Sequence, residues 1–557
     1  MKSTALLVIF VAIFVFETTK CKTYQPKVRI GNYTTIIGRV KRTVDAHKKY
    51  DAFYAIPYAR PPVGDLRFRA PLTLTETEMQ IVIDSSTDPC PCLQQTRFEG
   101  GCEDCLYLNV YRPHLRGNSE LLPVMVWIYG GAFVRGSNSY KFYGPDFLLN
   151  ENVIVVTINY RLGVFGFLGT EDASAPGNYG IKDQLLALQW VNKNIVSFGG
   201  NPGRVTLFGE SAGAASVSYL SQLAVTKGLF QGAIMESGSS LCSWSFVKRP
   251  LETAKSLAKL LGVDTNKTAT MVDSLRQINH KALQDAQSFL IKKSILFDNL
   301  LDELTFSPCV EPASSDALIT RGSYSLLNEG KYHEIPYMMG YNSLEVSGLL
   351  IAAAVGPISL YFGKFNLEPE KMVPLSLNID EPDVKERVVQ IIRDYYFNNE
   401  RFITSKNQLR KFLSDGAFVR PITKSAQLYS LHANVYFYVF SYAGLLGSGY
   451  RQDVGHTEEL PYLWNSLGKS IPIHKQDQKM RVRMARLWTN FAKFGNPTPF
   501  NDSLLDNVVW PTVDAQGTFQ YLNISRILSV SKNPNWDSFT FWKNLFTEFQ
   551  NPPYNTY

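Results

Sequence analysis

The sequence has few features that would divide it into separate parts or attach it to a nucleic acid. Its 557 residues contain no Gly/Ser-rich or Pro-rich linker, no low-complexity tract and no internal repeat. Charged residues make up 19%, and the net charge of +7 is spread along the chain without long basic blocks, which argues against nucleic-acid binding. Zinc-binding, P-loop and dinucleotide-binding motifs are also absent. We therefore expect no metal, no cofactor and no nucleic-acid partner.

Long apolar runs are scarce as well, and the clearest one lies near the start. Residues 5–16 are continuously apolar and follow Lys2. A membrane-spanning helix needs about 20 such residues, so this run instead matches the apolar region of a secretory signal peptide, with Thr19 and Cys21 before the cleavage point. An uncleaved anchor is the alternative. We expect residues 1–21 to be removed and the rest to be secreted to the extracellular space without a membrane anchor.

Seven cysteines are present, and they fit an exported chain. Removal of Cys21 leaves six, which can pair in 15 ways. Four of them fall within 16 residues and should staple one loop, which leaves the last two to each other; the four are Cys90, Cys92, Cys102 and Cys105, and the last two are Cys242 and Cys309. A zinc site is the alternative for the four, but a secreted chain favours disulfides.

Four Asn-x-Ser/Thr sequons are consistent with an exported glycoprotein. They lie at Asn32, Asn266, Asn501 and Asn523. These four positions are the candidate glycosylation sites, and because sequons also arise by chance the sequence leaves their occupancy open.

Apolar runs separated by turns and helical patterns predict an α/β fold. Residues 122–129 and 153–160 are largely apolar rather than alternating, which is typical of strands covered on both faces. Further strand candidates are 27–30, 34–41, 205–208, 232–235, 335–339 and 434–442, and helical patterns occupy 183–194, 480–494 and 536–546. These elements favour a sheet with helices on both sides.

The most informative stretch is Gly209-Glu210-Ser211-Ala212-Gly213. It follows the strand candidate 205–208 and precedes small, helix-compatible residues, which is the context of a nucleophile elbow. The two glycines would tolerate the strained turn, and the turn would present the Ser211 hydroxyl above the sheet edge. The pentapeptide alone also arises by chance, so its flanks and partners decide its meaning.

A serine nucleophile needs a histidine base and an acid that orients the histidine. In the elbow type of fold these follow in the order serine, acid, histidine. His456 comes after the strand candidate 434–442 in a glycine-containing loop, and Glu345 comes after the strand candidate 335–339. Both would therefore lie at the carboxyl edge of the sheet. Placement alone leaves open that either is only a surface residue.

An acyl-transfer intermediate also needs N–H donors for its oxyanion. The amide of Ala212, directly after the nucleophile, is one expected donor. The glycine-rich loop 129–133, which follows the strand candidate 122–129, would supply the others.

Taken together these residues resemble type-B carboxylesterases of the cholinesterase-like α/β-hydrolase family, in particular secreted insect carboxylesterases. The matching stretches run in order along nearly the whole chain: 56–68, 103–111, 127–133, 159–168, 177–180, 198–217, Glu345, 455–456 and 488–499. The resemblance implies one domain over residues 22–557, with the α/β-hydrolase fold and a large, mostly parallel central sheet.

The resemblance also implies roles for individual residues. Ser211, Glu345 and His456 would form the catalytic triad, and Gly131, Ala132 and Ala212 would donate to the oxyanion. It further implies a supporting serine at Ser237, a Cys92–Cys105 disulfide and an Arg67–Glu103 ion pair. The activity would be hydrolysis of a small carboxylic ester through an acyl-enzyme.

Some positions depart from the family pattern and bear on the substrate. The loop between Cys92 and Cys105 contains no Trp, which argues against a choline ester. Glu210 stands where juvenile-hormone esterases usually have Gln, which argues against that subtype. Ala132 replaces a usual glycine but keeps its N–H, and Val346 replaces the glycine usual after the acid. We expect an apolar, uncharged ester, bound near loops 285–308 and 349–362; a catalytically silent esterase-like binding or adhesion protein is the alternative.

Overall fold

The computed structural model describes residues 24–31, 34–75, 78–79, 81–94, 100–114, 120–297, 302–346, 359–400, 403–447, 453–466, 474–514 and 517–557. The expected signal peptide and the sequon at Asn32 lie outside these residues, as does most of the expected pocket loop 349–362.

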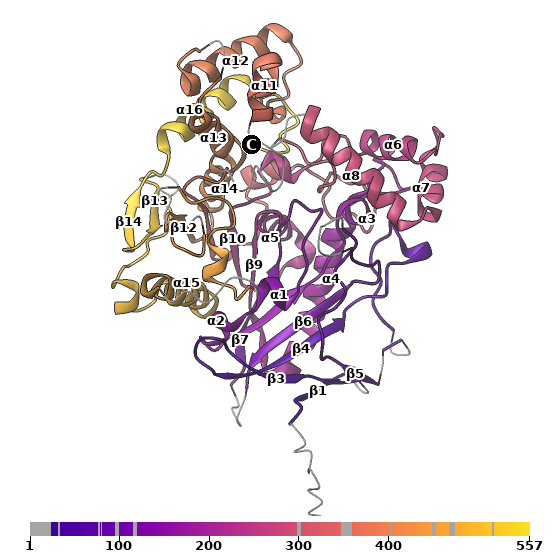
Figure 1. Ribbon diagram of the computed structural model, residues 1–557, viewed down its shortest axis with the longest axis vertical. Helices are drawn as coiled ribbons and strands as arrows, with labels where there is room; N and C mark the ends of the chain where they lie inside the picture. The colour runs from indigo at the N-terminus through magenta and orange to yellow at the C-terminus, as the bar shows by residue number, and fades with distance from the viewer. Residues whose placement is uncertain are drawn as a thin grey trace, which may run out of the picture.

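An eleven-stranded sheet forms the centre of the molecule (Figure 1). From one edge to the other it contains β14 (Ser529–Lys532), β13 (Gln520–Ile524), β12 (Val435–Phe440), β11 (Tyr337–Asn342), β10 (Gly232–Glu236), β9 (Gly200–Glu210), β7 (Leu122–Ile128), β8 (Ile154–Ile158), β6 (Tyr107–Pro113), β4 (Lys49–Pro57) and β3 (Arg39–Arg42). A second sheet holds β1 (Lys27–Ile30), β2 (Thr34–Ile37) and β5 (Val82–Asp84).

The pairings from β8 to β13 are parallel, and those at both margins are antiparallel. Every residue of β8 and β10 is buried, so both faces of the central strands are covered. These findings confirm the predicted α/β-hydrolase fold. They also split the predicted strand 34–41 at Gly38, where an added Cβ would come 2.6 Å from the Ala52 carbonyl oxygen, so that β2 and β3 join different sheets.

Helices connect and cover the strands (Figure 1). α5 packs on β9 and β10, whereas α15 packs on β7 and β9. The helices are α1 (Tyr140–Tyr143), α2 (Asp146–Leu149), α3 (Gly163–Phe167), α4 (Tyr179–Asn194), α5 (Ala212–Gln222), α6 (Pro250–Leu260), α7 (Thr268–Gln277), α8 (His280–Phe297), α9 (Ser323–Asn328), α11 (Ser359–Leu367), α12 (Pro382–Phe397), α13 (Lys406–Ser414), α14 (Arg420–Tyr429), α15 (Lys475–Phe494) and α16 (Trp536–Phe549).

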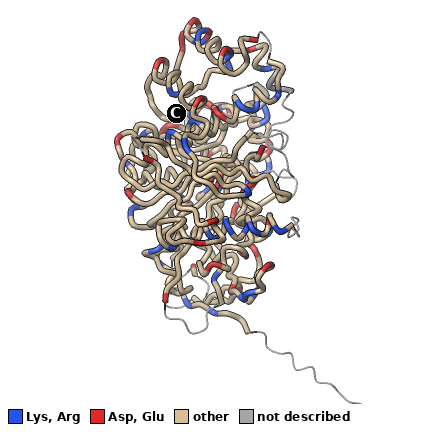
Figure 2. Tube along the Cα trace, turned by 90° about the vertical axis from the view of Figure 1, so that its left-hand side faces the viewer, with Lys and Arg blue, Asp and Glu red and all other residues tan. Residues whose placement is uncertain are grey.

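Basic and acidic residues are interspersed over the length of the trace in Figure 2, as the mild net charge suggests. Over the described ranges, no helix combines the length and the apolar character needed to cross a membrane.

Candidate active site

The elbow forms as the sequence predicts, with strand β9 ending at Glu210 and helix α5 beginning at Ala212. Between them Ser211 has φ 58° and ψ −122°, a conformation that non-glycine residues adopt only when their surroundings enforce it. The Ser211 N–H donates to the Glu236 carbonyl oxygen at 2.8 Å, which anchors the turn to the neighbouring strand β10. The strained residue is thus the serine itself.

The two glycines of the motif have a different purpose from the one expected. Neither has a positive φ. Instead, a Cβ at Gly213 would lie 2.0 Å from the Ile128 carbonyl oxygen, and one at Gly209 would lie 2.6 Å from the same atom. The glycines are therefore required because β7 passes too close for any side chain.

The expected acid and base meet at the carboxyl edge of the sheet. Glu345 Oε2 lies 2.7 Å from His456 Nδ1, and the His456 N–H donates to the Glu345 carbonyl oxygen at 3.0 Å. Glu345 is fully buried and its Oε1 accepts the Asn342 N–H at 2.7 Å. These bonds fix the carboxylate so that it orients the imidazole, and they put a proton on Nδ1.

The other ring nitrogen of His456 faces a carboxylate that sequence reasoning did not assign. Nε2 lies 2.9 Å from Glu210 Oε1. Burial lowers the pKa of His456, but the charges of Glu210 and Glu345 outweigh it and raise the pKa well above its usual value. Ser211 Oγ makes no hydrogen bond within the described residues. Glu210 and Glu345 thus contact the two ring nitrogens of His456 and favour its protonated form. The place of Glu210 next to the serine is the signal that could have indicated this contact.

Two further carboxyl groups are buried behind the histidine. Burial, reinforced by the charges of Glu459 and Glu210, raises the pKa of Glu236 well above its usual range, although its Oε1 accepts a hydrogen bond from Trp488 Nε1 at 2.8 Å. Burial and the charge of Glu210 raise the pKa of Glu459 to about 8. Asn342 Nδ2 donates to this second carboxyl at 2.5 Å. The site thus stores protons on carboxyl groups that would be ionised in water.

The glycine-rich loop lies directly against the elbow. A Cβ on Gly130 would come 2.5 Å from the Glu210 carbonyl oxygen and 2.9 Å from Ser211 Cβ. Gly131 and Ala132 have φ 108° and 56°, and the Gly131 carbonyl oxygen accepts two later amides of its own turn. No acceptor meets the N–H groups of Gly131, Ala132 or Ala212 within the part of the chain described. Three free donors therefore gather beside Ser211, at the amino end of α5.

Three residues implied by the resemblance lie outside the triad: Ser237 and the Arg67–Glu103 pair. Ser237, directly after β10, is fully buried with φ 52°, and its N–H donates to the Gly340 carbonyl oxygen at 2.9 Å. The Arg67–Glu103 ion pair is confirmed, with both guanidinium contacts at 2.6 Å. None of the three forms a hydrogen bond or ion pair with Ser211 or His456 within the described structure.

The cysteine prediction is right for one cluster and wrong for the other pair. Cys92 is bonded to Cys105 and Cys90 to Cys102. Cys242 and Cys309 are instead free and buried, which contradicts their predicted pairing. Pairing by elimination took no account of where each thiol points.

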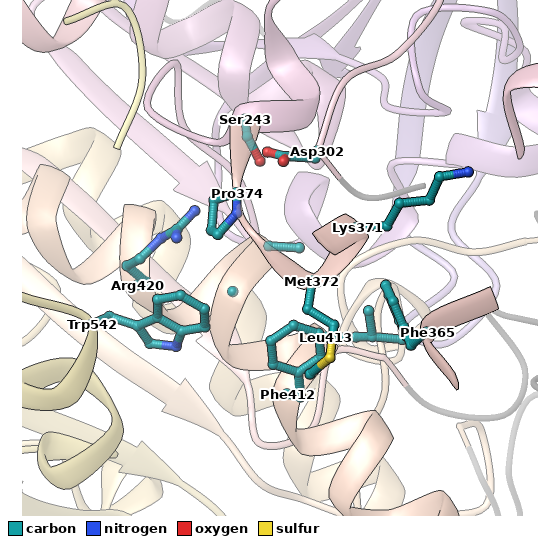
Figure 3. Close-up of a pocket in the computed structure, with 12 residues that line it drawn as sticks. Ser243, Asp302, Phe365, Lys371, Met372, Pro374, Phe412, Leu413, Arg420 and Trp542 are labelled. Carbon is teal, nitrogen blue, oxygen red and sulfur yellow. The ribbon is translucent and has the colours of Figure 1, made fainter. Parts of the chain in front are cut away.

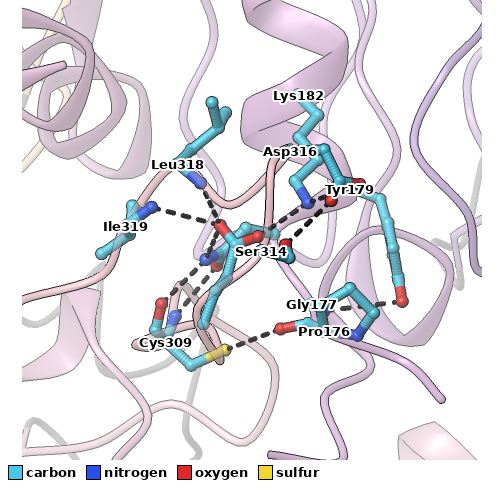
Figure 4. Close-up of polar contacts among 11 residues, drawn as sticks. Pro176, Gly177, Tyr179, Lys182, Cys309, Ser314, Asp316, Leu318 and Ile319 are labelled. Atoms are coloured by element: carbon cyan, nitrogen blue, oxygen red, sulfur yellow. Dashed lines mark hydrogen bonds and ion pairs between the residues drawn. The ribbon is translucent and has the colours of Figure 1, made fainter. Parts of the chain in front are cut away.

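The surroundings of Cys309 explain why it does not reach Cys242 (Figure 4). Its Sγ faces the Pro176 carbonyl oxygen at 4.0 Å, and its N–H and carbonyl are both held by the side chain of Asn178. Cys242 lies in the turn after β10, where its N–H donates to the Ser239 carbonyl oxygen at 3.1 Å. The two thiols are therefore fixed to different loops.

The sequons differ in exposure. Asn266 and Asn501 are exposed. Asn523 is half-buried in β13, where its Oδ1 accepts a hydrogen bond from Ser441 Oγ at 2.5 Å. No cluster of three or more His, Cys, Asp and Glu side chains suited to a metal ion occurs in the described ranges.

Comparison with known proteins agrees with this geometry. Residues 25–542 match the sequence profile of the Carboxylesterase family. The chain is 34% identical to a juvenile hormone esterase of Tribolium castaneum over 84% of this chain and 83% of that one, and 31% identical to venom carboxylesterase-6 of Apis mellifera over 93% and 94%. The crystal structure of a Manduca sexta juvenile hormone esterase with OTFP covalently attached superimposes with a TM-score of 0.82 at 28% identity, covering 94% of this chain and 100% of that one.

Proposed function

We propose that this chain, which belongs to the carboxylesterase family and is a carboxylic ester hydrolase, works through an acyl-enzyme on Ser211. The observation that carries the proposal is the 2.7 Å contact between Glu345 and His456, made beside a serine held in a strained turn. Each of the three groups comes from the carboxyl end of a parallel strand, so the sheet itself aligns them.

In this mechanism His456 accepts the Ser211 proton at Nε2 while Oγ attacks the ester carbonyl carbon. The N–H groups of Gly131, Ala132 and Ala212 stabilise the negative charge that develops on the carbonyl oxygen. The imidazolium then gives its proton to the departing alcohol. Water, deprotonated by the same imidazole, releases the carboxylate and restores Ser211.

The resting contact between His456 and Glu210 adds a requirement to this scheme. Nε2 must lose its proton and turn from Glu210 to Ser211 before it can act as a base. Since its pKa is raised, turnover should increase with pH up to a value above the usual histidine range.

We also propose that the substrate is an apolar, uncharged ester. The buried side chains of Glu210 and Glu345 both contact the histidine, and their charges disfavour substrates that bring further negative charge. The relatives include esterases named for juvenile hormone and for venom. We further propose that residues 22–557 form one secreted, glycosylated domain after removal of residues 1–21.

The test is labelling of the purified chain with a fluorophosphonate, together with hydrolysis of a short-chain aryl ester. Ser211→Ala should abolish both, and Glu345→Gln should lower kcat/KM by about 10⁴-fold because the imidazole loses its orienting charge. Ser256→Ala, on the exposed face of α6, is the matched control and should behave as wild type. A folded wild-type protein that neither labels nor turns over would overturn the mechanism and favour a binding protein.

A further inference from the structure

We propose that a cavity around Arg420, outside the catalytic site, binds a short-chain carboxylate. The cavity measures about 60 Å³ and lies between the π-helical turn Asp415–Val419, the start of α14, the segment 371–374 and helix α16 (Figure 3). One buried water needs about 10–15 Å³ of such volume. The space therefore suits a carboxylate of about two to four carbons.

The first observation is an unpaired buried cation. Arg420 is 1% exposed, and its Nε and Nη1 atoms have no hydrogen-bond partner within the described residues. Its guanidinium lies 4.9 Å from the Trp542 ring centroid and 4.4 Å from that of Phe546, contacts that compensate only partly for lost water. Burial lowers its pKa to about 10, so the group remains charged at neutral pH.

Two other buried arginines, Arg161 and Arg67, are each paired with a carboxylate. Arg161 makes two contacts with Asp183, at 2.8 and 2.6 Å, and Arg67 makes two with Glu103. A guanidinium buried without such a carboxylate is unfavourable. Arg420 therefore lacks the partner that the same fold supplies elsewhere, and a carboxylate matches its planar fork of donors.

The second observation is the apolar character of one side of the cavity, although Ser243, Asp302 and Lys371 also line it. Met372, Phe412, Leu413 and Trp542 line the space beside the guanidinium. A chloride or phosphate ion would meet Arg420 but leave these walls without contacts. A carboxylate with a short alkyl tail satisfies both, because its charged end meets the guanidinium and its tail packs on the side chains.

A competing charge stands on another wall. Asp302 lines the same cavity, where its Oδ2 accepts the Leu375 N–H and where burial raises the pKa of its carboxyl group. Its charge attracts Arg420, but the two groups form no ion pair within the described structure. Figure 3 shows them on different sides of the space. Removing the charge of Asp302 should therefore strengthen the binding of an anion.

The cavity is separate from the nucleophile but adjacent to the base. Ala417 lines it and accepts a hydrogen bond from Trp244 Nε1 at 2.9 Å, whereas the next residue, Phe418, packs its ring 4.9 Å from that of His456. One turn of backbone thus divides the two sites, and binding at Arg420 needs no participation of Ser211.

The experiment is calorimetric titration of the full chain with sodium butyrate, with sodium chloride at equal ionic strength as the second probe. All proteins carry Ser211→Ala, so the result does not depend on the proposed catalytic mechanism. We expect saturable binding of butyrate and none of chloride. Arg420→Met should weaken binding by at least tenfold, and Asp302→Asn should tighten it by about threefold or more.

A second variant keeps Arg420 and fills the space. An added Cβ at Gly416 meets only the Trp542 ring, at 3.7 Å, so Gly416→Val should fold and lose binding. Lys424→Met, on the same helix but outside the residues that line the cavity, is the control and should bind as the parent does. Absence of binding, or binding unchanged by both Arg420→Met and Gly416→Val, would overturn the proposal in favour of a water-filled cavity. Equal binding of chloride would overturn the carboxylate assignment.

Discussion

Two buried groups of charges in this molecule are handled in opposite ways. Around Cys309, Glu311 Oε2 meets Lys182 Nζ at 2.7 Å, and Oε1 accepts hydrogen bonds from Asn178, Leu318 and Ile319 (Figure 4). Around His456, by contrast, two buried carboxyl groups, Glu210 and Glu345, contact one imidazole, and the buried Glu236 and Glu459 have no cation of their own within the described residues. The paired charges of Lys182 and Glu311 hold a loop in place. The unpaired carboxyl groups near His456 shift pKa values, and acid–base chemistry requires shifted pKa values.

The largest effect is expected when the buried ion pair between Lys182 and Glu311 is broken. Lys182→Met leaves Glu311 buried without its cation and should lower the free energy of unfolding by about 3–5 kcal/mol. Urea denaturation measures this. Lys182→Met with Glu311→Gln should recover most of the loss. Arg387→Met, which breaks an exposed pair with Glu548, is the control and should cost less than about 1 kcal/mol. Similar losses of stability in Lys182→Met and Arg387→Met would show that burial does not make the Lys182–Glu311 pair more important than an exposed pair.

A smaller, pH-dependent effect on the free energy of unfolding is expected from the buried carboxyl group of Glu236. The pKa of Glu236 is raised in the folded state, so the folded protein holds more protons than the unfolded chain above about pH 4.5. Stability should fall as pH rises through this range. Glu236→Gln removes that contribution, and its stability relative to wild type should increase from pH 5 to pH 7. Parallel pH profiles of the two proteins in urea would contradict the raised pKa.

The smallest effect concerns the two carboxylates that flank His456. Glu210→Gln removes one of them, so the pKa of His456 should fall and the acidic limb of kcat/KM should move about one unit to lower pH. The direction follows because the imidazole must be neutral to act as the base. Glu329→Gln, at an exposed pair with Arg321, should leave the limb in place. An unmoved limb in Glu210→Gln would mean that Glu210 does not hold the resting imidazolium.

Chain order and strand ends made Glu345 and His456 candidates for the site, and the family resemblance was needed to predict their contact. Glu345 follows β11 and His456 follows β12, and because these strands are parallel neighbours their following loops meet. The core elements were also predicted to within a few residues: α15 begins at Lys475 rather than at residue 480, and β11 ends at Asn342 rather than at 339. The spacing of apolar residues detects such elements because the residues on a buried face recur at regular intervals.

Features that depend on side-chain direction or on distance through space escaped sequence reasoning. The motif places Glu210 next to Ser211 but does not show that its side chain turns toward His456, since that contact depends on the loop from another strand. The Cys242–Cys309 prediction failed for the same reason, because counting leaves two cysteines but does not bring them together. Arg420 gave no signal at all, since its isolation arises only when α16 and the segment 371–374 close around it.

The crowding around the elbow has an evolutionary consequence. At Gly209 and Gly213 a single methyl group would run into the backbone of β7, and at Gly130 it would run into the backbone of the elbow. Single substitutions at these three glycines are therefore excluded by the backbone around them. Changes in substrate preference are therefore expected at other positions, such as the loops above the sheet. The glycines that hold the reacting groups in place should stay unchanged.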